Sequence, residues 1–373
     1  MTSHQSPDVI VVGGGVIGCS IAYHLAREGV TVAVLDRGEI GGEASSAAAG
    51  MLAPLAEMER AGPLQDLGLA SLRLFPELAA ALQRDAGVDI EHLASGILRV
   101  VLTEDEEAYL RGLASDPAAE LELHWLAPNE LRDLEPALSP AVRGALYSPE
   151  EQQVNADRLV QALARAASAF GAALLPQRPV TRLLTRNGRI EGIRTPTGDL
   201  FAGHVVLAAG PWTATLAAPI GVNVPVFPVR GQMMAFPSRS ALRHVVWASA
   251  GYLVPKANGL VFAGATVEKV GFRRNTTTAG LAGLKRMASS LVPRLAAIDA
   301  ADSWAGLRPG SPDGLPILGP LPGWERLSVA SGHYRNGILL APITGQLIAR
   351  SIIDGSSNEA LSPFSAARFV AAS

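Results

Sequence analysis

The sequence is poor in the residues that carry disulfide, metal and nucleic-acid chemistry. Its 373 residues include one cysteine, Cys19, so no disulfide can form within the chain, and a reducing cytoplasm suits it. No Cys/His set with zinc spacing occurs, so we expect no metal. The net charge is only −3 and no basic block is present, so we expect no nucleic-acid partner.

Membrane, hydrolase and kinase signals are missing as well. The N-terminus has no positively charged region of the kind that opens a signal peptide. No stretch approaches the roughly 20 apolar residues that cross a bilayer. The sequence shows neither a GxSxG elbow nor a Walker phosphate loop. We therefore expect no transmembrane segment, and hydrolytic and phosphoryl-transfer chemistry have no motif support.

What is present is the composition and local pattern of an α/β protein. Apolar residues make up 48%, and 373 residues are too many for one compact core, so two interlocked domains are expected. A β-branched run at 8–12 predicts a buried parallel strand. The residues after it predict a helix that ends at Gly29, and 31–35 predict a second strand.

The turn after the first predicted strand has the GxGxxG spacing of a dinucleotide site. Gly13 permits a tight turn, Gly15 lets a pyrophosphate approach the backbone, and Gly18 lets the helix pack on the strand. The helix N-terminus offers N–H groups and a positive dipole end to phosphate. Asp36, 23 residues after Gly13, would accept from a ribose hydroxyl. A glycine-rich turn without ligand is the alternative, and this strand–turn–helix–strand–acid context disfavours it.

The first motif leaves NAD and FAD open, and two later segments favour a flavin. Residues 41–51 are a run of tiny side chains, which lets backbone N–H groups lie flat against a planar ligand and suits a helix that starts near a pyrophosphate. A flexible linker is the alternative. The turn at 332–337 again follows a predicted strand and opens a helix, whose N-terminus would face the electron-rich end of a flavin ring. An ordinary strand–helix turn is the alternative there.

The rest of the chain completes two domains. Helices are predicted at 64–86 and from the N-cap Asn155 to Gly171, hairpins within 180–204, and short alternating strands over 96–147 and 226–264. The predicted fold is α/β: a Rossmann-like FAD-binding domain with an inserted α+β substrate domain built on an antiparallel sheet. The FAD-binding domain comprises 1–85, 152–223 and 304–367, and the substrate domain comprises 86–151 and 224–303.

The candidate chemical residues are few, because a cofactor would carry the hard step of a redox reaction. An amino-acid carboxylate calls for an arginine fork. Arg308 is the leading candidate because apolar or rigid neighbours surround it within 304–309, and Arg335 and Tyr252 come next. Any single arginine is more often in a surface ion pair. His333, on a turn, is more often structural than catalytic.

Over residues 9–354 the chain resembles the D-amino-acid oxidase and sarcosine oxidase family, and its glycine-oxidase-like members most. The segments that carry the resemblance are SSAAAGML at 45–52, WAGLRPG at 304–310 and GHYRNGILLAP at 332–342. The resemblance implies a two-domain flavoprotein and a homo-oligomer such as a tetramer. Covalent members use a cysteine late in the chain, and none stands there, so non-covalent FAD is implied.

The resemblance also implies roles for individual residues. Arg308 looks like the arginine that binds substrate carboxylate, Tyr252 like a substrate-contacting tyrosine, and Arg335 like a second active-site arginine. Asp36 stands where glutamate is common, with a shorter reach and the same ribose role. The residues implied to contact FAD are Gly13, Gly15, Val16, Ile17, Gly18, Asp36, Ala44, Ser45, Ser46, Ala48, Ala49, Gly50, Met51, Val180, Gly210, Trp212, Gly332, His333, Arg335, Asn336, Gly337 and Ile338.

The implied reaction is oxidative deamination of a small amino acid: glycine first, with sarcosine or D-alanine beside it. Hydride would pass to the flavin and oxygen would take the electrons, giving glyoxylate, ammonia and hydrogen peroxide. A family link to thiamine biosynthesis implies that the glycine imine feeds the thiazole ring. The alternatives are a D-amino-acid or sarcosine oxidase, a dehydrogenase that uses a quinone, a flavin module in tRNA modification, and an NAD dehydrogenase.

Overall fold

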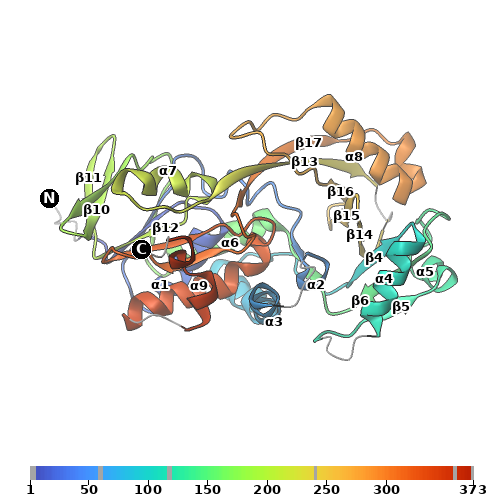
Figure 1. Cartoon of the computed structure of the whole chain (residues 1–373), viewed down its shortest axis with the longest axis horizontal. Helices are drawn as coiled ribbons and strands as arrows, with labels where there is room; N and C mark the ends of the chain where they lie inside the picture. Colours follow the sequence, from blue (N-terminus) through green and yellow to red (C-terminus); the bar gives the residue numbers. More distant parts are fainter. Residues whose placement is uncertain (1–5, 58–61, 116–119, 239–241, 356–358, 371–373) are drawn as a thin grey trace.

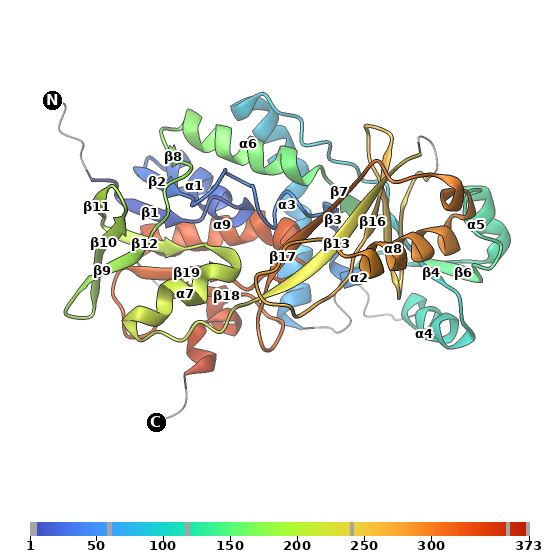
Figure 2. The same ribbon diagram turned by 90° about the horizontal axis from the view of Figure 1, so that it is seen from above.

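The protein forms two lobes joined by long strands. The computed structural model describes residues 6–57, 62–115, 120–238, 242–355 and 359–370. Figure 1 shows one lobe built around α1 (Val16–Arg27) and α9 (Gly337–Asp354), and another around α4 (Glu104–Ala114) and α8 (Thr278–Leu291). The two longest strands, β13 and β17, extend between the lobes side by side (Figure 2).

A six-stranded sheet organises the first lobe. Its strand order is β18-β19-β12-β1-β2-β8, and every neighbouring pair is parallel except β18 with β19. The predicted parallel sheet with the glycine-rich turn at a strand end is therefore present. The strands are β1 (Val9–Val12), β2 (Val32–Leu35), β8 (Ala173–Leu175), β12 (His204–Leu207), β18 (Ile317–Pro320) and β19 (Leu327–Ser331).

The first strand is apolar throughout because both faces of this sheet are covered. Val9 and Val11 pack into a cluster with α1, whereas Ile10 and Val12 pack into a second cluster on the opposite face. Alternate residues of a strand point to opposite faces, so a strand buried on both sides needs an unbroken apolar run. All four residues of β1 are at most 4% exposed.

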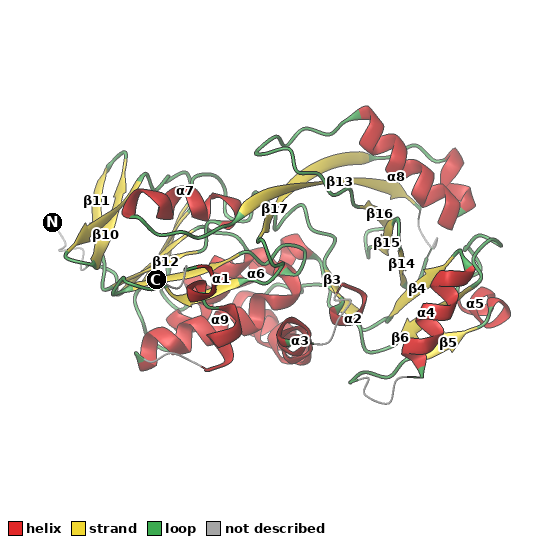
Figure 3. Cartoon of the chain, viewed as in Figure 1, coloured by secondary structure: helices red, strands yellow, loops and turns green. Residues whose placement is uncertain are grey.

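Four helices cover one face of the sheet and pack on one another. They are α1, α3 (Pro63–Ala86), α6 (Ala156–Ala169) and α9, and Figure 3 shows α1, α3 and α9 gathered on one side of the sheet. The predicted start of α6 is confirmed, because the Asn155 side-chain oxygen accepts from the Arg158 N–H at 3.2 Å. The other face carries α7 (Thr213–Ala217) and the predicted hairpins, as β9 (Arg182–Arg186), β10 (Arg189–Thr195) and β11 (Gly198–Phe201).

Within the described residues, α9 is the one helix long and apolar enough to cross a membrane by length and composition. It is 18 residues long with a mean hydropathy of 1.2, and 56% of it is buried inside the protein. It packs against α1 and α3, as the core helix of a globular lobe does. A covered helix of this kind is weak evidence for a membrane span.

The second lobe is built on an eight-stranded sheet with the order β17-β13-β16-β15-β14-β4-β6-β5. The expected antiparallel sheet is present, with one exception: β14 pairs with β4 in parallel. The two strands come from separate insertions, so no hairpin sets their direction. The strands are β4 (Ile97–Val101), β5 (His124–Leu126), β6 (Gly144–Ser148), β13 (Phe227–Pro237), β14 (Val245–Ala248), β15 (Gly251–Pro255), β16 (Leu260–Gly264) and β17 (Asp302–Gly310).

The strand β17 bears on the predicted division into domains. The sequence places 304–367 in the FAD-binding domain, yet β17 pairs along its whole length with β13 of the eight-stranded sheet. We therefore propose that the last domain boundary follows Gly310. The remaining short elements are β3 (Met51–Leu52), α2 (Pro54–Glu57), α5 (Pro128–Leu134), β7 (Gln152–Gln153) and 3-10 turns at Gly210–Trp212, Ala218–Ile220, Pro293–Ala297, Glu359–Phe364 and Ala366–Phe369.

Candidate active site

A cavity of about 360 Å³ lies where the carboxyl ends of β1 and β2 meet the strands β13 and β17. It collects segments that are far apart in the sequence: the glycine-rich turn, the run of small residues after Asp36, and the turn before α9. All but four of the predicted site residues line it. The residues that do not line it are Gly18, Ser46, Gly332 and Asn336.

The glycines of the first turn are required by close backbone approaches. Gly13 has φ of +112°, and a Cβ placed on it would lie 2.3 Å from the Ala208 carbonyl oxygen. A Cβ on Gly18 would lie 1.9 Å from the Gly13 carbonyl oxygen. Gly18 therefore acts by letting α1 pack against the turn, which explains why it does not line the cavity.

The N-terminus of α1 presents backbone donors to the cavity. The Val16 N–H donates to Ser45 Oγ at 2.9 Å, and the Gly14 N–H donates to Asp36 Oδ2 at 2.8 Å. Within the described part of the chain, the N–H groups of Gly15 and Ile17 have no partner. Two unsatisfied donors at the positive end of a helix fit a phosphate group.

The run of small residues after Asp36 forms successive turns and no helix, so the helix suggested there is wrong. The backbone instead wraps around the α1 N-terminus, because Ser45 Oγ bonds Val16 and the Gly41 N–H donates to the Gly14 carbonyl at 2.9 Å. Ser46 Oγ donates to the Glu43 carbonyl at 3.1 Å. That local bond explains why Ser46 does not reach the cavity.

Arg308 lies at the opposite end of the site, on β17. Its guanidinium rests flat on β13, since a Cβ on Gly231 would fall 2.3 Å from Nη1. Nη1 donates to the Thr266 carbonyl at 3.0 Å. None of the described carboxylates forms an ion pair with Arg308, although the side chain is half-buried. A half-buried cation held only by a neutral acceptor is suited to bind an incoming carboxylate.

The other two predicted substrate residues are brought together by a tryptophan. Trp247 stacks on the Tyr252 ring at 5.5 Å between centroids, and the Arg335 guanidinium lies 5.1 Å from the Trp247 ring. The Tyr252 hydroxyl donates to Met233 Sδ at 3.4 Å. Tyr252, Arg335 and Met233 all line the cavity with Arg308.

His333 is a buried neutral histidine. Burial lowers its pKa to about 3, and Nε2 pairs with Thr344 Oγ1 at 3.1 Å. It lines the cavity, so a neutral ring faces any ligand there. An imidazole with a pKa of about 3 is a poor general base near neutral pH, because it takes up a proton only weakly there. This favours the structural interpretation of His333.

The turn before α9 is tied directly to β17. The Tyr334 N–H donates to the Pro309 carbonyl at 2.8 Å, which fixes the turn beside Arg308. Asn336 lies behind the lining, and its side-chain oxygen is buried without a partner among the described residues.

Several lining or supporting residues were missed from the sequence. Arg37 stacks on Trp212, with 3.6 Å between the guanidinium carbon and the ring centroid, and its position directly after Asp36 was a usable signal. Gly231 also had a signal, because glycine inside a strand indicates a close approach. Trp247 had a local one, because it pairs with Tyr252 across the β14–β15 hairpin. Met233 had none, since alternation along a strand gives a face and not a neighbour.

Comparison with known proteins identifies the family. A family model described as DAO, FAD dependent oxidoreductase, matches residues 8–351. The chain belongs to this family of FAD-dependent oxidoreductases. The α/β fold predicted from the sequence is confirmed, and so is FAD as the cofactor.

Individual relatives agree over nearly the whole chain. Glycine oxidase of Geobacillus kaustophilus (strain HTA426) is 38% identical over 374 residues, which is 97% of each chain. A crystal structure of glycine oxidase from Geobacillus kaustophilus superposes with a TM-score of 0.91, at 36% identity, over 98% of this chain and 100% of that one. The bifunctional protein ThiO/ThiG of Trichormus variabilis is 37% identical over 97% of this chain and 55% of that protein.

The residues of this FAD-dependent oxidoreductase fit its cofactor. The unpartnered N–H groups of Gly15 and Ile17 and the close-packed glycines would hold its diphosphate. Asp36 binds the N–H groups of Gly14 and Gly38, each at 2.8 Å through a different oxygen, which holds its carboxylate at the cavity wall. Each oxygen keeps a second lone pair for a ribose hydroxyl.

A buried lysine fastens the second lobe of the flavoprotein to the wall of this site. Lys256 Nζ donates to the Val154 carbonyl at 3.1 Å and to Gln153 Oε1 at 3.3 Å, next to the lining residue Gly50. Burial lowers the pKa of this ammonium to about 7, although Glu91 acts to raise it. Between pH 7 and the ordinary lysine value, the unfolded chain therefore binds a proton that the folded chain lacks.

We expect the free energy of unfolding to rise above pH 7 because of Lys256, by up to about 1.4 kcal/mol per pH unit. Below pH 7 both states are protonated and this contribution is flat. In the variant Lys256→Met, the free energy of unfolding should no longer rise above pH 7. Denaturant unfolding in excess FAD from pH 6 to 9 measures this free energy, and Lys269→Met, at an exposed lysine, serves as the control. If wild type and Lys256→Met show the same dependence on pH, the lowered pKa of Lys256 is refuted.

Proposed function

We propose that this FAD-dependent oxidoreductase is an amino-acid oxidase that deaminates glycine, and accepts sarcosine or D-alanine less well. The observation that carries the proposal is Arg308, a half-buried cation in the cavity without an ion-pair partner among the described carboxylates. The relatives named glycine oxidase support it, at 33–38% identity.

In this proposal, the cavity residues bind and orient the substrate. The Arg308 guanidinium takes the substrate carboxylate as a fork, because a planar pair of N–H groups matches the two oxygens. Tyr252 and Met233 form the adjacent wall, and Arg335 closes the side nearest α9. Because the side chains of Tyr252, Met233 and Arg335 are large, the space beside Arg308 would admit only a small substrate, which favours glycine over bulkier amino acids.

We infer that positioning, rather than a side-chain base, supplies most of the catalysis. The acids that line the cavity are Asp36 and Glu43. Asp36 is bonded to the glycine-rich turn, and Glu43 pairs with Arg37 and Arg274 at 2.7 Å each. His333 is neutral and bonded to Thr344. The substrate would therefore bind with its amine already uncharged.

The cofactor supplies the redox chemistry: when bound, FAD takes two electrons from the substrate and returns them to oxygen. We propose that no cysteine attaches it covalently. Cys19 is fully buried on α1, with Sγ bonded to the Gly14 carbonyl at 3.4 Å, and burial raises its pKa to about 12. The balanced products are glyoxylate, ammonia and hydrogen peroxide from glycine, water and oxygen.

We further propose a role in thiamine synthesis, in which the glycine imine supplies the thiazole ring. The relative named bifunctional protein ThiO/ThiG is about twice as long as this chain, and the matching region makes up 55% of it. That a region like this chain is fused to a second functional region in that protein supports the proposal. The cytoplasmic location and a homo-oligomer such as a tetramer remain predictions. A sarcosine or D-amino-acid oxidase of the same family is the second candidate, and the substrate profile separates it.

The test is the absorbance spectrum of the purified protein, recorded before and after anaerobic addition of glycine, sarcosine and D-alanine in separate samples. We expect flavin bands that bleach fastest with glycine, followed by peroxide formation on admission of air. Bands that bleach only with another amine would keep the mechanism and change the substrate. A protein that holds FAD and is bleached by none of the three would contradict the proposal.

A further inference from the structure

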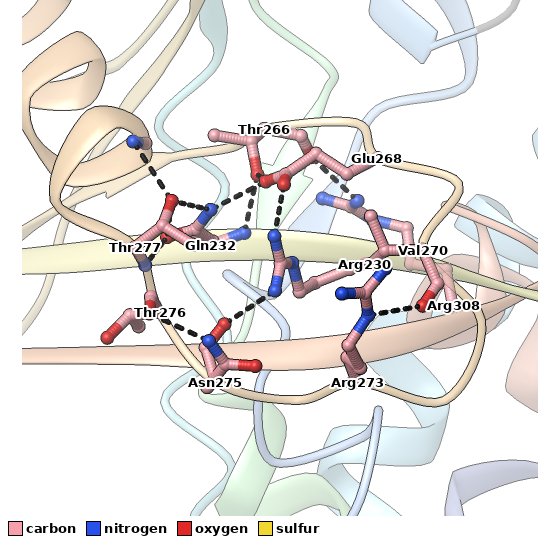
Figure 4. A network of polar contacts seen from close by, with 11 residues as sticks. Arg230, Gln232, Thr266, Glu268, Val270, Arg273, Asn275, Thr276, Thr277 and Arg308 are labelled. Carbon is pink, nitrogen blue, oxygen red and sulfur yellow. Dashed lines mark hydrogen bonds and ion pairs between the residues drawn. The ribbon is translucent and has the colours of Figure 1, made fainter.

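A partly buried polar network lies beside Arg308 (Figure 4). Glu268 is at its centre: it pairs with Arg230, and its Oε1 accepts from the Gln232 amide and from Thr266 Oγ1, each at 2.6 Å. The backbones of Arg230 and Glu268 exchange both hydrogen bonds, at 2.9 and 3.0 Å. The segment after β16 is therefore fastened to β13 as if it were an extra strand.

The partners of Glu268 on β13 are withdrawn from solvent, whereas the Glu268 side chain itself is 26% exposed. Arg230 is 5% exposed and Gln232 is fully buried. Burial acts to raise the pKa of Glu268, but the hydrogen bonds from Arg230, Thr266 and Gln232 hold that pKa below its usual range. Glu268 is thus a charged acceptor, and charge-assisted bonds of this kind hold geometry more firmly than neutral ones.

The network meets Arg308 at one atom. Thr266 binds Glu268 through its hydroxyl and accepts from Arg308 Nη1 through its carbonyl, at 3.0 Å. The Gln232 N–H also donates to the Thr266 hydroxyl, at 2.9 Å. Arg308 is held between this carbonyl and the bare backbone of Gly231. The network therefore orients the guanidinium without placing a negative charge on it.

We propose that Glu268 is a positioning residue for substrate carboxylate binding, acting on Arg308 through Thr266. The proposal rests on the proposed function in that Arg308 is taken as the carboxylate site. A carboxylate placed directly beside Arg308 would compete with the substrate, whereas a carbonyl held by a remote carboxylate fixes the fork and leaves its charge available. The network accordingly sets affinity for carboxylates, and it has little effect on the rate once substrate is bound.

The experiment compares Glu268→Gln and Thr266→Val with wild type as FAD-loaded proteins. The first removes the charge, and the second removes the hydroxyl link while the carbonyl that Arg308 uses remains. We expect both to raise the KM for glycine and the Kd for acetate, measured from the perturbed flavin spectrum, by about tenfold. The kcat for glycine should stay within about threefold of wild type.

Glu135→Gln is the matched control. Glu135 is 1% exposed and binds the N–H groups of Arg243 and His244, each at 2.7 Å, in the same lobe and without contact to Arg308. We expect it to lower the thermal midpoint and to leave both constants unchanged. Unchanged acetate binding in the Glu268 and Thr266 variants, or equal weakening in Glu135→Gln, would overturn the proposal.

If Glu268→Gln does not fold, Thr266→Val by itself tests the positioning role, because it keeps the ion pair between Glu268 and Arg230. If wild type binds acetate but is not reduced by glycine, the proposed substrate fails while the positioning role is still measured by acetate.

Discussion

Replacing Arg308 with alanine is expected to raise the KM for glycine by about 100- to 1000-fold, the loss typical of one partner of a buried, charge-assisted pair. The guanidinium is placed to receive a carboxylate in the cavity, and it lies on Gly231 with Nη1 hydrogen-bonded to the Thr266 carbonyl. Steady-state oxygen consumption measures KM and kcat, and acetate titration of the flavin spectrum measures carboxylate binding directly.

Two further variants sharpen this prediction. Arg308→Lys keeps the charge but loses the fork, so its KM should lie between those of wild type and alanine. Arg111→Ala removes an arginine that pairs with Glu107 at 3.0 Å on the exposed face of α4. It should change neither the KM for glycine nor the binding of acetate. A KM for Arg308→Ala within a few-fold of wild type would place the carboxylate site elsewhere, with Arg335 as the next candidate.

Gly18→Ala is expected to destabilise the protein by about 3 kcal/mol or more and to release FAD. The new methyl group would lie 1.9 Å from the Gly13 carbonyl oxygen, which is backbone and cannot rotate away. Helix α1 would have to shift from the turn, and the N–H groups of Gly15 and Ile17 would move with it. The ratio of flavin to protein absorbance and the thermal midpoint measure the two effects.

Gly112→Ala is the control for the helix itself. Gly112 lies within α4, where an added Cβ meets nothing within 4 Å, so alanine there should be neutral or stabilising by up to about 1 kcal/mol. The comparison separates crowding from helix propensity. A Gly18→Ala protein that retains stoichiometric FAD and the wild-type midpoint would show that the turn can relax, contrary to this account.

The cofactor half of the site could be predicted because its chemistry is local. The glycine spacing, the β-branched strand before it and Asp36 after it all lie within residues 9–36, and each has a backbone or helix-dipole reason to stand where it does. The run of small residues after Asp36 was also recognisable. Its shape was not, because its alanines favour a helix, whereas the hydrogen bonds of Ser45 with Val16 and of Gly41 with Gly14 hold the segment in turns.

The substrate half of the site depended on contacts between distant strands. Arg308 could be singled out by its apolar neighbours. Its hydrogen bond to the Thr266 carbonyl, 42 residues earlier, is predicted by no pattern in either segment. Trp247 and Tyr252 are opposite each other in the β14–β15 hairpin, so their stacking is local, but the contact of Arg335 with Trp247 joins this hairpin to a distant turn. The parallel pairing of β14 with β4 was missed because separate insertions, and no hairpin, bring those strands together.

A dinucleotide site, the α/β class and the arginine to examine could be predicted from consecutive residues, because a phosphate cradle and an apolar parallel strand each lie within one segment. The choice of FAD over NAD rested on later segments and on the family that they resemble. The assembled fold was needed to show that Gly18 is absent from the cavity lining, that burial keeps His333 neutral, and that Glu268 reaches Arg308 through Thr266. The physical reason is that burial and charge–charge geometry arise only when separate segments meet, since neither the desolvation of His333 nor the bond from Arg308 to Thr266 exists within one segment.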